Sequence, residues 1–385
     1  MGRFHILLLT PSLWPLHRDS RGRAVADLAD ALHAAGARVS IMTTAEGCVD
    51  TLPLARRLEG LPLATPAQTR HVAWFQGRSP SGCADVWAAA TSDWVRLGPE
   101  ALRLSGGRRS VDIIHAVDDA AAALVAIRTV PSIATLTELP RLASEAWSAG
   151  VENARAVVVP SQTFARHPSP AWRPALAGAR QVVGILHGSR TPSAVRDAES
   201  VRSVLGLSRH LPLATTHGPV DVRRTGDLHQ LPSLPLCVVA ATGAQTPAGC
   251  QLAPLAERHP RRIVLLERND PRLAAVRACA DLHIFGAAYY PNPEDPLGSA
   301  PTLAVAHSSG SFADSIVPWD QGSESGNGFR FADGELLTAL AQATKALSAS
   351  AQPLLRRARR LQPSWQRAGQ QYRLLYQRLA ALTAD

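Results

Sequence analysis

The chain has 385 residues, a hydrophobic content of 46% and a formal net charge of +9. This length exceeds one ordinary hydrophobic core and suits two domains of roughly 150–200 residues each, and the hydrophobic content excludes a chain that is disordered throughout. No apolar run approaches the ~20 residues of a membrane-spanning helix, and Phe4–Leu9 is too short for a signal peptide. We therefore expect a cytoplasmic protein without a membrane segment.

The first half of the chain alternates short apolar runs with segments of helical periodicity. The predicted strands are His5–Thr10, Arg38–Thr43, Val111–Ala116, Ser132–Leu136 and Ala156–Pro160. The predicted helices between them are Ala24–Ala35 and Asp119–Thr129. This βαβ rhythm indicates a parallel sheet that is covered on both faces, which places the chain in the α/β class.

A proline-rich stretch at Pro168–Pro174 separates this series from a second one. The strands expected there are Val182–Leu186, Leu211–Thr215, Leu236–Ala240, Arg262–Leu266, Asp281–Phe285 and Thr302–Ala306. The expected helices are Asp270–Cys279, Leu336–Leu347 and Leu354–Leu382. We therefore predict one Rossmann-like domain over residues 1–167, a second over residues 168–353 and a terminal helix over residues 354–385.

Cysteine, histidine and the basic residues give no sign of a metal site or of a nucleic-acid interface. The five cysteines form no C-x-x-C pair, and the thirteen histidines form no H-E-x-x-H pattern, so neither a metal nor another cofactor is predicted. The positive charge is dispersed and almost entirely arginine, since Lys345 is the sole lysine, and aromatic residues make up only 5% of the chain. A nucleic-acid partner is therefore the least favoured hypothesis, because a stacking platform is lacking.

The last quarter carries an ordered run of motifs. They are Asp295-Pro296-Leu297-Gly298, then Ser309-Gly310-Ser311-Phe312-Ala313-Asp314, then Gly326-Asn327-Gly328-Phe329, and finally Ser364-Trp365 followed by Tyr372 and Tyr376. In this order the run resembles the C-terminal domain of glycogen and bacterial starch synthases, which are glucosyltransferases of the GT-B fold. In the N-terminal half, Val25–Leu32 and Asp112–Asp118 are similar to that family's L-A-D-V-x-x-A-L helix and D-V-V-H-A-H-D strand end.

The resemblance implies a GT-B architecture, in which two Rossmann-like domains face each other across a cleft and the terminal helix crosses back to the first domain. A ligand would bind at the carboxyl ends of the strands. The implied partners are a nucleotide sugar, ADP-glucose or UDP-glucose, which serves as a substrate and not as a cofactor, and an α-glucan acceptor. The implied activity is glucosyl transfer with retention of configuration.

Six residues stand at positions of the family's site motifs, some of them as replacements. Ser309, Gly310 and Ser311 stand where the T-G-G loop offers backbone N–H groups to the nucleotide phosphates. Asp295 occupies the place of the E-P-C-G glutamate beside the transferred sugar, with Glu294 as a rival candidate.

Two arginines complete this set. Arg224 replaces the lysine of S-R-L-x-x-Q-K-G, and Arg21 stands in the K-x-G-G-L region. Both would meet the negative charge of the diphosphate, which grows as the sugar departs.

Other positions depart from the family pattern. Arg23 and Ala24 replace the glycine pair of K-x-G-G-L, Pro219 replaces the arginine of S-R-L, and Leu136-Thr137-Glu138 lacks the histidine of V-H-N. The segment from Asp295 to Ser309 is about two helical turns shorter than in the family. Two main hypotheses follow: a retaining glycosyltransferase with an eroded active site, or a non-catalytic pseudoenzyme of that family that binds glucan or a protein partner.

Overall fold

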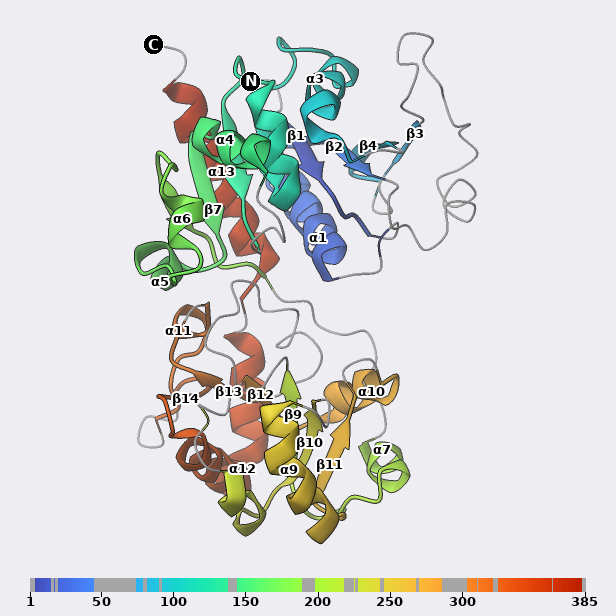
Figure 1. Ribbon diagram of the computed structural model, residues 1–385, viewed down its shortest axis with the longest axis vertical. Coiled ribbons are helices and arrows are strands. Elements are labelled where there is room, and N and C mark those ends of the chain that lie inside the picture. Colours follow the sequence, from blue (N-terminus) through green and yellow to red (C-terminus); the bar gives the residue numbers. More distant parts are fainter. Residues whose placement is uncertain are drawn as a thin grey trace. The chain divides into compact units, whose positions relative to one another are not determined.

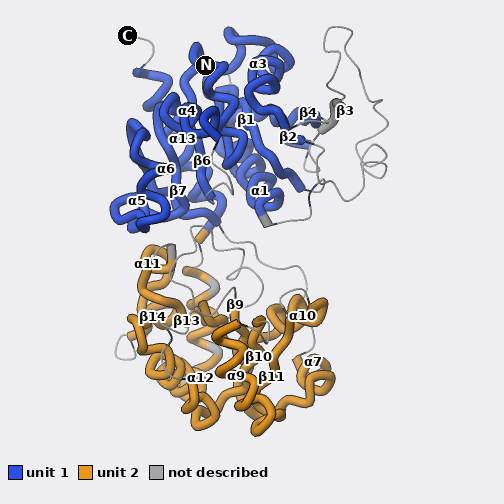
Figure 2. Tube along the Cα trace, viewed as in Figure 1, with its two compact units in different colours: residues 1–188, 364–385 blue, residues 189–363 orange. Residues whose placement is uncertain are grey.

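The computed structural model describes two compact units (Figures 1 and 2). Unit 1 consists of Met1–Gly188 and Ser364–Asp385, and unit 2 consists of Ser189–Pro363. The residues described are 4–14, 17, 20–44, 74–78, 82–89, 92–137, 144–188, 198–217, 225, 228–242, 246–267, 270–285, 303–309, 311–320, 325–361 and 363–382. No helix in these ranges is both long and apolar enough to span a membrane.

Unit 1 is built around an eight-stranded sheet with the order β3-β4-β2-β1-β5-β6-β7-β8. Its strands are β1 (His5–Thr10), β2 (Arg38–Thr44), β3 (Trp74–Arg78), β4 (Ala84–Ala89), β5 (Ile113–Val117), β6 (Ser132–Thr135), β7 (Ala156–Val159) and β8 (Val182–Gly184). Its helices are α1 (Ser20–Ala34), α3 (Trp94–Leu104), η1 (Asp118–Val125), α4 (Glu145–Asn153), α5 (Gln162–Arg166), α6 (Arg173–Leu176) and α13 (Trp365–Ala381). All neighbouring strands are parallel except β3, which pairs with β4 in the antiparallel sense.

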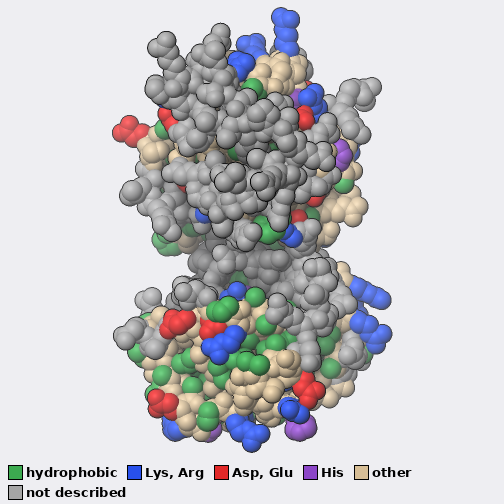
Figure 3. All heavy atoms as spheres, turned by 90° about the vertical axis from the view of Figure 1, so that its right-hand side faces the viewer, with side chains coloured by type: hydrophobic (Ala, Val, Ile, Leu, Met, Phe, Trp, Pro, Cys, Tyr) green, Lys and Arg blue, Asp and Glu red, His purple; other side chains and the backbone are tan. Residues whose placement is uncertain are grey.

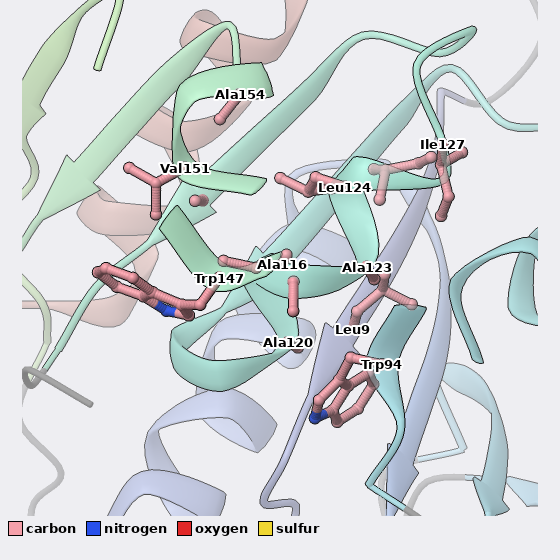
Figure 4. Packing of buried hydrophobic residues seen from close by; sticks show 14 of the residues in the cluster. Leu9, Trp94, Ala116, Ala120, Ala123, Leu124, Ile127, Trp147, Val151 and Ala154 are labelled. Carbon is pink, nitrogen blue, oxygen red and sulfur yellow. The ribbon is translucent and has the colours of Figure 1, made fainter. Parts of the chain in front are cut away.

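Side chains of the central strand β1 alternate between two hydrophobic cores. Leu7 and Leu9 pack with residues of η1, α3 and α4, whereas Ile6 and Leu8 pack with residues of α1 and α13. Figure 4 shows the first of these cores, in which Leu9, Trp94, Ala123 and Trp147 converge from four elements. Burial on both faces explains why the strands of this sheet read as continuous apolar runs.

Unit 2 contains a six-stranded parallel sheet with the order β11-β10-β9-β12-β13-β14. Its strands are β9 (Leu213–His217), β10 (Cys237–Ala241), β11 (Ile263–Leu266), β12 (Leu282–Phe285), β13 (Leu303–His307) and β14 (Gly328–Phe331). Its helices are α7 (Ala198–Val204), η2 (Leu228–Ser233), α9 (Pro247–Arg258), α10 (Arg272–Cys279), α11 (Ser311–Ser315) and α12 (Leu336–Arg360). The predicted α/β class is confirmed, since helices alternate with parallel strands in both units.

Two predicted segments differ from the structure. The run at Val182–Leu186, which we placed in the second domain, contains β8, and β8 pairs with β7 at the edge of the unit 1 sheet. Residues 168–188 therefore belong to unit 1. The helix predicted over Leu354–Leu382 is divided between the end of α12 in unit 2 and α13 in unit 1.

Helix α13 is tied to unit 1 by a buried network of hydrogen bonds. Nδ1 of His115 shares a hydrogen bond of 2.7 Å with the hydroxyl of Tyr376, and Nε2 shares one of 2.7 Å with Oγ1 of Thr135. The Tyr372 hydroxyl lies 3.0 Å from Oγ1 of Thr135 and 3.0 Å from Nε2 of His187. All five side chains are buried.

Burial has a strong effect on the two imidazoles of this network. It lowers the pKa of His115 to about 3 and that of His187 to about 4, because the charged form would lose its hydration. The His187 ring also stacks on Trp365, with 5.2 Å between the ring centroids.

Close packing also holds α13 against unit 1. At Gly369, α13 approaches α1 so closely that a Cβ atom would press against Ala31. The C-terminal aromatic motif is thus a structural anchor of unit 1.

Candidate functional site at the carboxyl ends of the unit 2 strands

The strand order of unit 2 places a topological switch point between β9 and β12. From β9 the chain continues to β10 and β11 on one side, whereas β12 and β13 lie on the other. In open α/β sheets, ligands bind outside the carboxyl ends of the strands at such a point. Here β9 ends at His217 and β12 ends at Phe285, and these two residues are in register.

Aromatic rings line this point of the sheet. The rings of His217 and Phe285 are stacked with centroids 5.0 Å apart, and Phe285 is stacked on Phe312 of α11 at 4.7 Å. Phe285 and Phe312 are almost completely buried, and His217 retains 8% of its surface exposure. The stack therefore fixes the His217 ring at the edge of the sheet.

A second imidazole lies beside His217. Nε2 of His217 is 3.0 Å from Nδ1 of His283, and Nε2 of His283 is 3.1 Å from the carbonyl oxygen of Arg277. Burial, followed by the nearby charges of His283 and Arg277, lowers the pKa of His217 well below its ordinary value. His217 is therefore neutral at physiological pH.

The predicted phosphate-binding residue Ser309 lies just beyond the carboxyl end of β13. Its Oγ is 2.8 Å from Nδ1 of His307, and its backbone N–H donates to the His307 carbonyl over 2.8 Å. Nε2 of His307 is 2.8 Å from a carboxylate oxygen of Asp333. Ser311 begins α11, and Gly310 lies outside the described residues. The turn after β13 is thus held by side-chain hydrogen bonds at the same edge of the sheet as His217.

The other predicted site residues are not brought together within the described structure. Arg21 lies half-buried in the first turn of α1, in unit 1. Asp295 and Arg224 belong to segments of unit 2 outside the described residues. The neighbouring Arg23 carries its guanidinium 4.5 Å from the ring centroid of Trp14, which is a cation–π contact.

Unit 1 has a strained residue at the corresponding edge of its own sheet. Asp118 directly follows β5 and has a φ of 48°, a conformation that non-glycine residues seldom adopt. Its carboxylate accepts hydrogen bonds from the backbone N–H of Thr137 over 2.6 Å and from the Thr137 hydroxyl over 2.7 Å. Its carbonyl oxygen accepts a bond from Nε1 of Trp147. Asp118 therefore fixes the chain after β6, where the family's V-H-N histidine would stand.

The sequence reasoning missed His217, His283 and His307. The available signal was a histidine inside or at the end of an otherwise apolar strand, since all three belong to β9, β12 and β13 and are buried. The strand predicted at Leu211–Thr215 stopped short of His217. Within the described ranges, no group of three or more His, Cys, Asp or Glu side chains is arranged to hold a metal ion.

The described basic side chains do not gather around one place on the face shown in Figure 3. Small groups of Lys and Arg lie at several separate places there, with acidic, hydrophobic and other side chains between them.

Solved structures of a starch synthase, a sucrose-phosphate synthase and a trehalose-phosphate synthase share this architecture along nearly the whole chain. The catalytic domain of starch synthase IV from Arabidopsis thaliana, bound to ADP and acarbose, matches 99% of this chain and 100% of its own, with a TM-score of 0.74 and 16% identity. Sucrose-phosphate synthase from Thermosynechococcus elongatus matches 99% of this chain and 100% of its own, with a TM-score of 0.59 and 18% identity. A UDP-forming trehalose-phosphate synthase from Burkholderia vietnamiensis matches 100% of this chain and 99% of its own, with a TM-score of 0.60 and 11% identity.

No model of a known protein family matches the sequence, and no curated protein matches it. At these low identities the structural likeness establishes the fold. The chain has the GT-B fold of glycosyltransferases, as the motif order predicted.

Proposed function

We propose that the protein is a retaining glycosyltransferase of the glycogen and starch synthase type. It would transfer glucose from ADP-glucose or UDP-glucose to an α-glucan, with the donor bound at the carboxyl ends of the unit 2 strands. The observation that carries this proposal is the match to the starch synthase IV domain, which spans both chains almost completely. The ordered C-terminal motifs and the position of Ser309 after β13 support it.

In this reaction the bond between the anomeric carbon and the diphosphate oxygen breaks. A bond from that carbon to a glucan hydroxyl oxygen forms on the same face, and the hydroxyl proton passes to the departing diphosphate. The protein must stabilise the negative charge that grows on the diphosphate. In our proposal Arg224, Arg21 and the backbone N–H groups around Ser309–Ser311 do so, and the Asp295 carboxylate lies beside the positive charge of the sugar ring.

A second candidate is a non-catalytic relative that binds glucan or a protein partner. The contact between Arg23 and Trp14 favours it, because a long side chain engaged in a cation–π contact stands at a glycine position of K-x-G-G-L. A ligand could then no longer lie as close to the backbone at that position as it can at a glycine.

Nucleotide release from ADP-glucose and UDP-glucose in the presence of glycogen tests the proposal. We expect turnover that falls roughly 100-fold or more in Asp295→Asn. The adjacent Glu294→Gln is the matched control and should stay within about threefold of the wild type.

The absence of both turnover and nucleotide-sugar binding by calorimetry would contradict the active reading. Glycogen binding without turnover would support the non-catalytic candidate. An equal loss of turnover in the two variants would leave the activity in place but contradict the particular role of Asp295.

A further inference from the structure

Acidic residues are spread unevenly along the chain. The two longest stretches without one are residues 336–384 and residues 153–196. The basic residues of these stretches are Lys345, Arg356, Arg357, Arg359, Arg360, Arg367, Arg373 and Arg378 in the first and Arg155, Arg166, Arg173, Arg180, Arg190 and Arg196 in the second. Together the two stretches carry more positive charge than the whole chain, whose net charge is +9. A surface that they form is therefore expected to attract an anionic partner.

The fold brings parts of both stretches together in unit 1. Helix α13 comes from the first stretch, and β7 and β8 come from the second. Tyr372 and Tyr376 of α13 pack in one hydrophobic core with Ala156 and Val158 of β7. No carboxylate side chain of these elements offsets the arginines of α13.

One stripe of α13 faces away from the core of unit 1. Its members follow one another every three or four residues, and all of them are exposed: Arg367, Gln371, Leu374, Arg378 and Leu382. Leu374 keeps 56% and Leu382 keeps 68% of its exposure. This set of residues, which we call the α13 stripe, is about 22 Å long at about 1.5 Å per residue.

Helix α1 packs on the other side of α13. Gly369, where a Cβ atom would meet Ala31 of α1, lies five residues before Leu374 and therefore roughly 140° away from it around the helix. The acidic residues of α1, Asp27 and Asp30, thus belong to an element on the side opposite the α13 stripe.

The combination of arginine and leucine along the α13 stripe decides between anionic partners. Nucleic acid would use the arginines, but stacking on bases needs exposed aromatic rings. In α13, Tyr372 and Tyr376 are buried, and Trp365 is stacked on His187. A lipid surface uses both kinds of side chain, since guanidinium groups bind its head-group phosphates and leucines enter the layer beneath them.

We propose that the α13 stripe binds an anionic lipid surface, with α13 lying in the plane of the interface. Arg367 and Arg378 contact phosphate groups, and Leu374 and Leu382 enter the boundary between head groups and acyl chains. Such a contact is peripheral and needs no membrane-spanning helix. It does not depend on the proposed function, because it uses no residue of the carboxyl edge of unit 2.

Co-sedimentation of the full chain with lipid vesicles tests the proposal. Vesicles of phosphatidylcholine alone are compared with vesicles that contain about one third phosphatidylglycerol, which supplies the negative charge. We expect binding to the anionic vesicles only. Raising the salt concentration from about 0.05 M to about 0.5 M should weaken this binding, because salt screens the attraction.

Two double variants separate the two kinds of contact. Arg367→Gln with Arg378→Gln should weaken binding to anionic vesicles roughly 25-fold, since each arginine near an anionic surface contributes about a factor of five. Leu374→Gln with Leu382→Gln should weaken it about tenfold or more, because the apolar contact with lipid is lost.

Each double variant has a matched control elsewhere on the surface. Arg108→Gln with Arg109→Gln removes the same charge from an exposed turn of unit 1. Val204→Gln with Val317→Gln removes two exposed apolar side chains from unit 2. Both controls should stay within about threefold of the wild type, because the attraction acts only within about a Debye length of the lipid surface. Circular dichroism checks that every variant is folded.

The inference is overturned if the wild type binds neutral and anionic vesicles equally, or binds neither. An equal loss in the arginine variant and its control would also overturn it, since net charge alone would then explain the binding. Wild-type binding by the leucine variant, or tighter binding of the protein to a DNA duplex than to anionic vesicles, would assign the α13 stripe to a soluble polyanion instead. The turnover assay of the proposed function is independent of all these results.

Discussion

The buried imidazoles of His115 and His187 should make unit 1 sensitive to acid. Both rings remain neutral in the folded protein until the pH approaches their lowered pKa values of about 3 and about 4. In the unfolded chain the same groups take up protons near pH 6.5. Below pH 6.5 the unfolded state therefore binds more protons than the folded state, and the free energy of unfolding falls as the pH falls.

The magnitude follows from the pKa difference. Each histidine removes about 1.4 kcal/mol of stability per pH unit below pH 6.5. At pH 5.0 this amounts to about 2 kcal/mol for each ring and about 4 kcal/mol for the pair, which is a large part of a domain's stability. The loss continues with falling pH until the folded-state rings themselves titrate.

Urea unfolding followed by tryptophan fluorescence at several pH values between 7.5 and 5.0 measures this slope. The signal reports mainly on unit 1, because Trp319 is the one tryptophan in unit 2 and the chain has eight. His187→Phe keeps a ring against Trp365 and removes one titrating group. The slope below pH 6.5 should fall by about 1.4 kcal/mol per pH unit.

The exposed His167 provides the control, since His167→Gln in the same unit should leave the slope at its wild-type value. An unchanged slope in His187→Phe would refute the reasoning, because the imidazole would then not be kept neutral by the fold. An equal reduction in both variants would refute it too.

Two further predictions concern packing and a partly buried ion pair. Gly150→Ala should lower the stability of unit 1 by about 3 kcal/mol in urea unfolding, because its Cβ would overlap the carbonyl of Ala121 in η1; a loss below about 1 kcal/mol would show that α4 can shift without cost. Asp281→Ala should cost about 2 kcal/mol in unit 2, since it leaves the mostly buried Arg202 guanidinium without its carboxylate at 3.3 Å. Glu199→Ala removes the carboxylate of an ion pair that is exposed on both sides and should cost clearly less; equal losses would contradict the role of burial.

Most strands were predictable from sequence because their burial on both faces leaves continuous apolar runs, but β3, β4 and β14 were not predicted. The neighbour with which a strand pairs is harder to predict than the strand itself. Val182–Leu186 was recognised as a strand, but nothing in its local pattern shows that β8 joins β7 rather than a strand of the following series. Strand partners depend on contacts between distant segments, which periodicity does not encode.

At the terminal helices, proline alone does not show where a helix ends, since α12 continues through Pro353 but stops before Pro363. Helical periodicity continues from α12 into α13, so the pattern predicted one long helix through Pro363. Proline disfavours helical geometry in the residue before it, and its ring cannot continue the hydrogen bonds of the preceding turn. The helices accordingly end at Arg360 and begin again at Trp365.

The site was less predictable than the fold, because its key relation joins two strands. The hydrogen bond between His217 and His283 spans 66 residues and exists only because β9 pairs with β12 in one particular register. A motif comparison identifies Ser309 and Asp295 by position, but it does not find a contact that the family pattern lacks. Such contacts can be predicted only once the register of the paired strands is known.

The motifs that identify the fold are therefore not the ones that decide activity. Tyr372 and Tyr376 are retained where their buried hydroxyl groups hold α13 against β5 and β6, and a non-catalytic protein would need that anchor as much as an enzyme. The carboxyl edge of unit 2, where Ser309 follows β13, is not part of that anchor. Turnover by the wild-type protein, together with its loss in Asp295→Asn, would distinguish the proposed enzyme from the non-catalytic candidate.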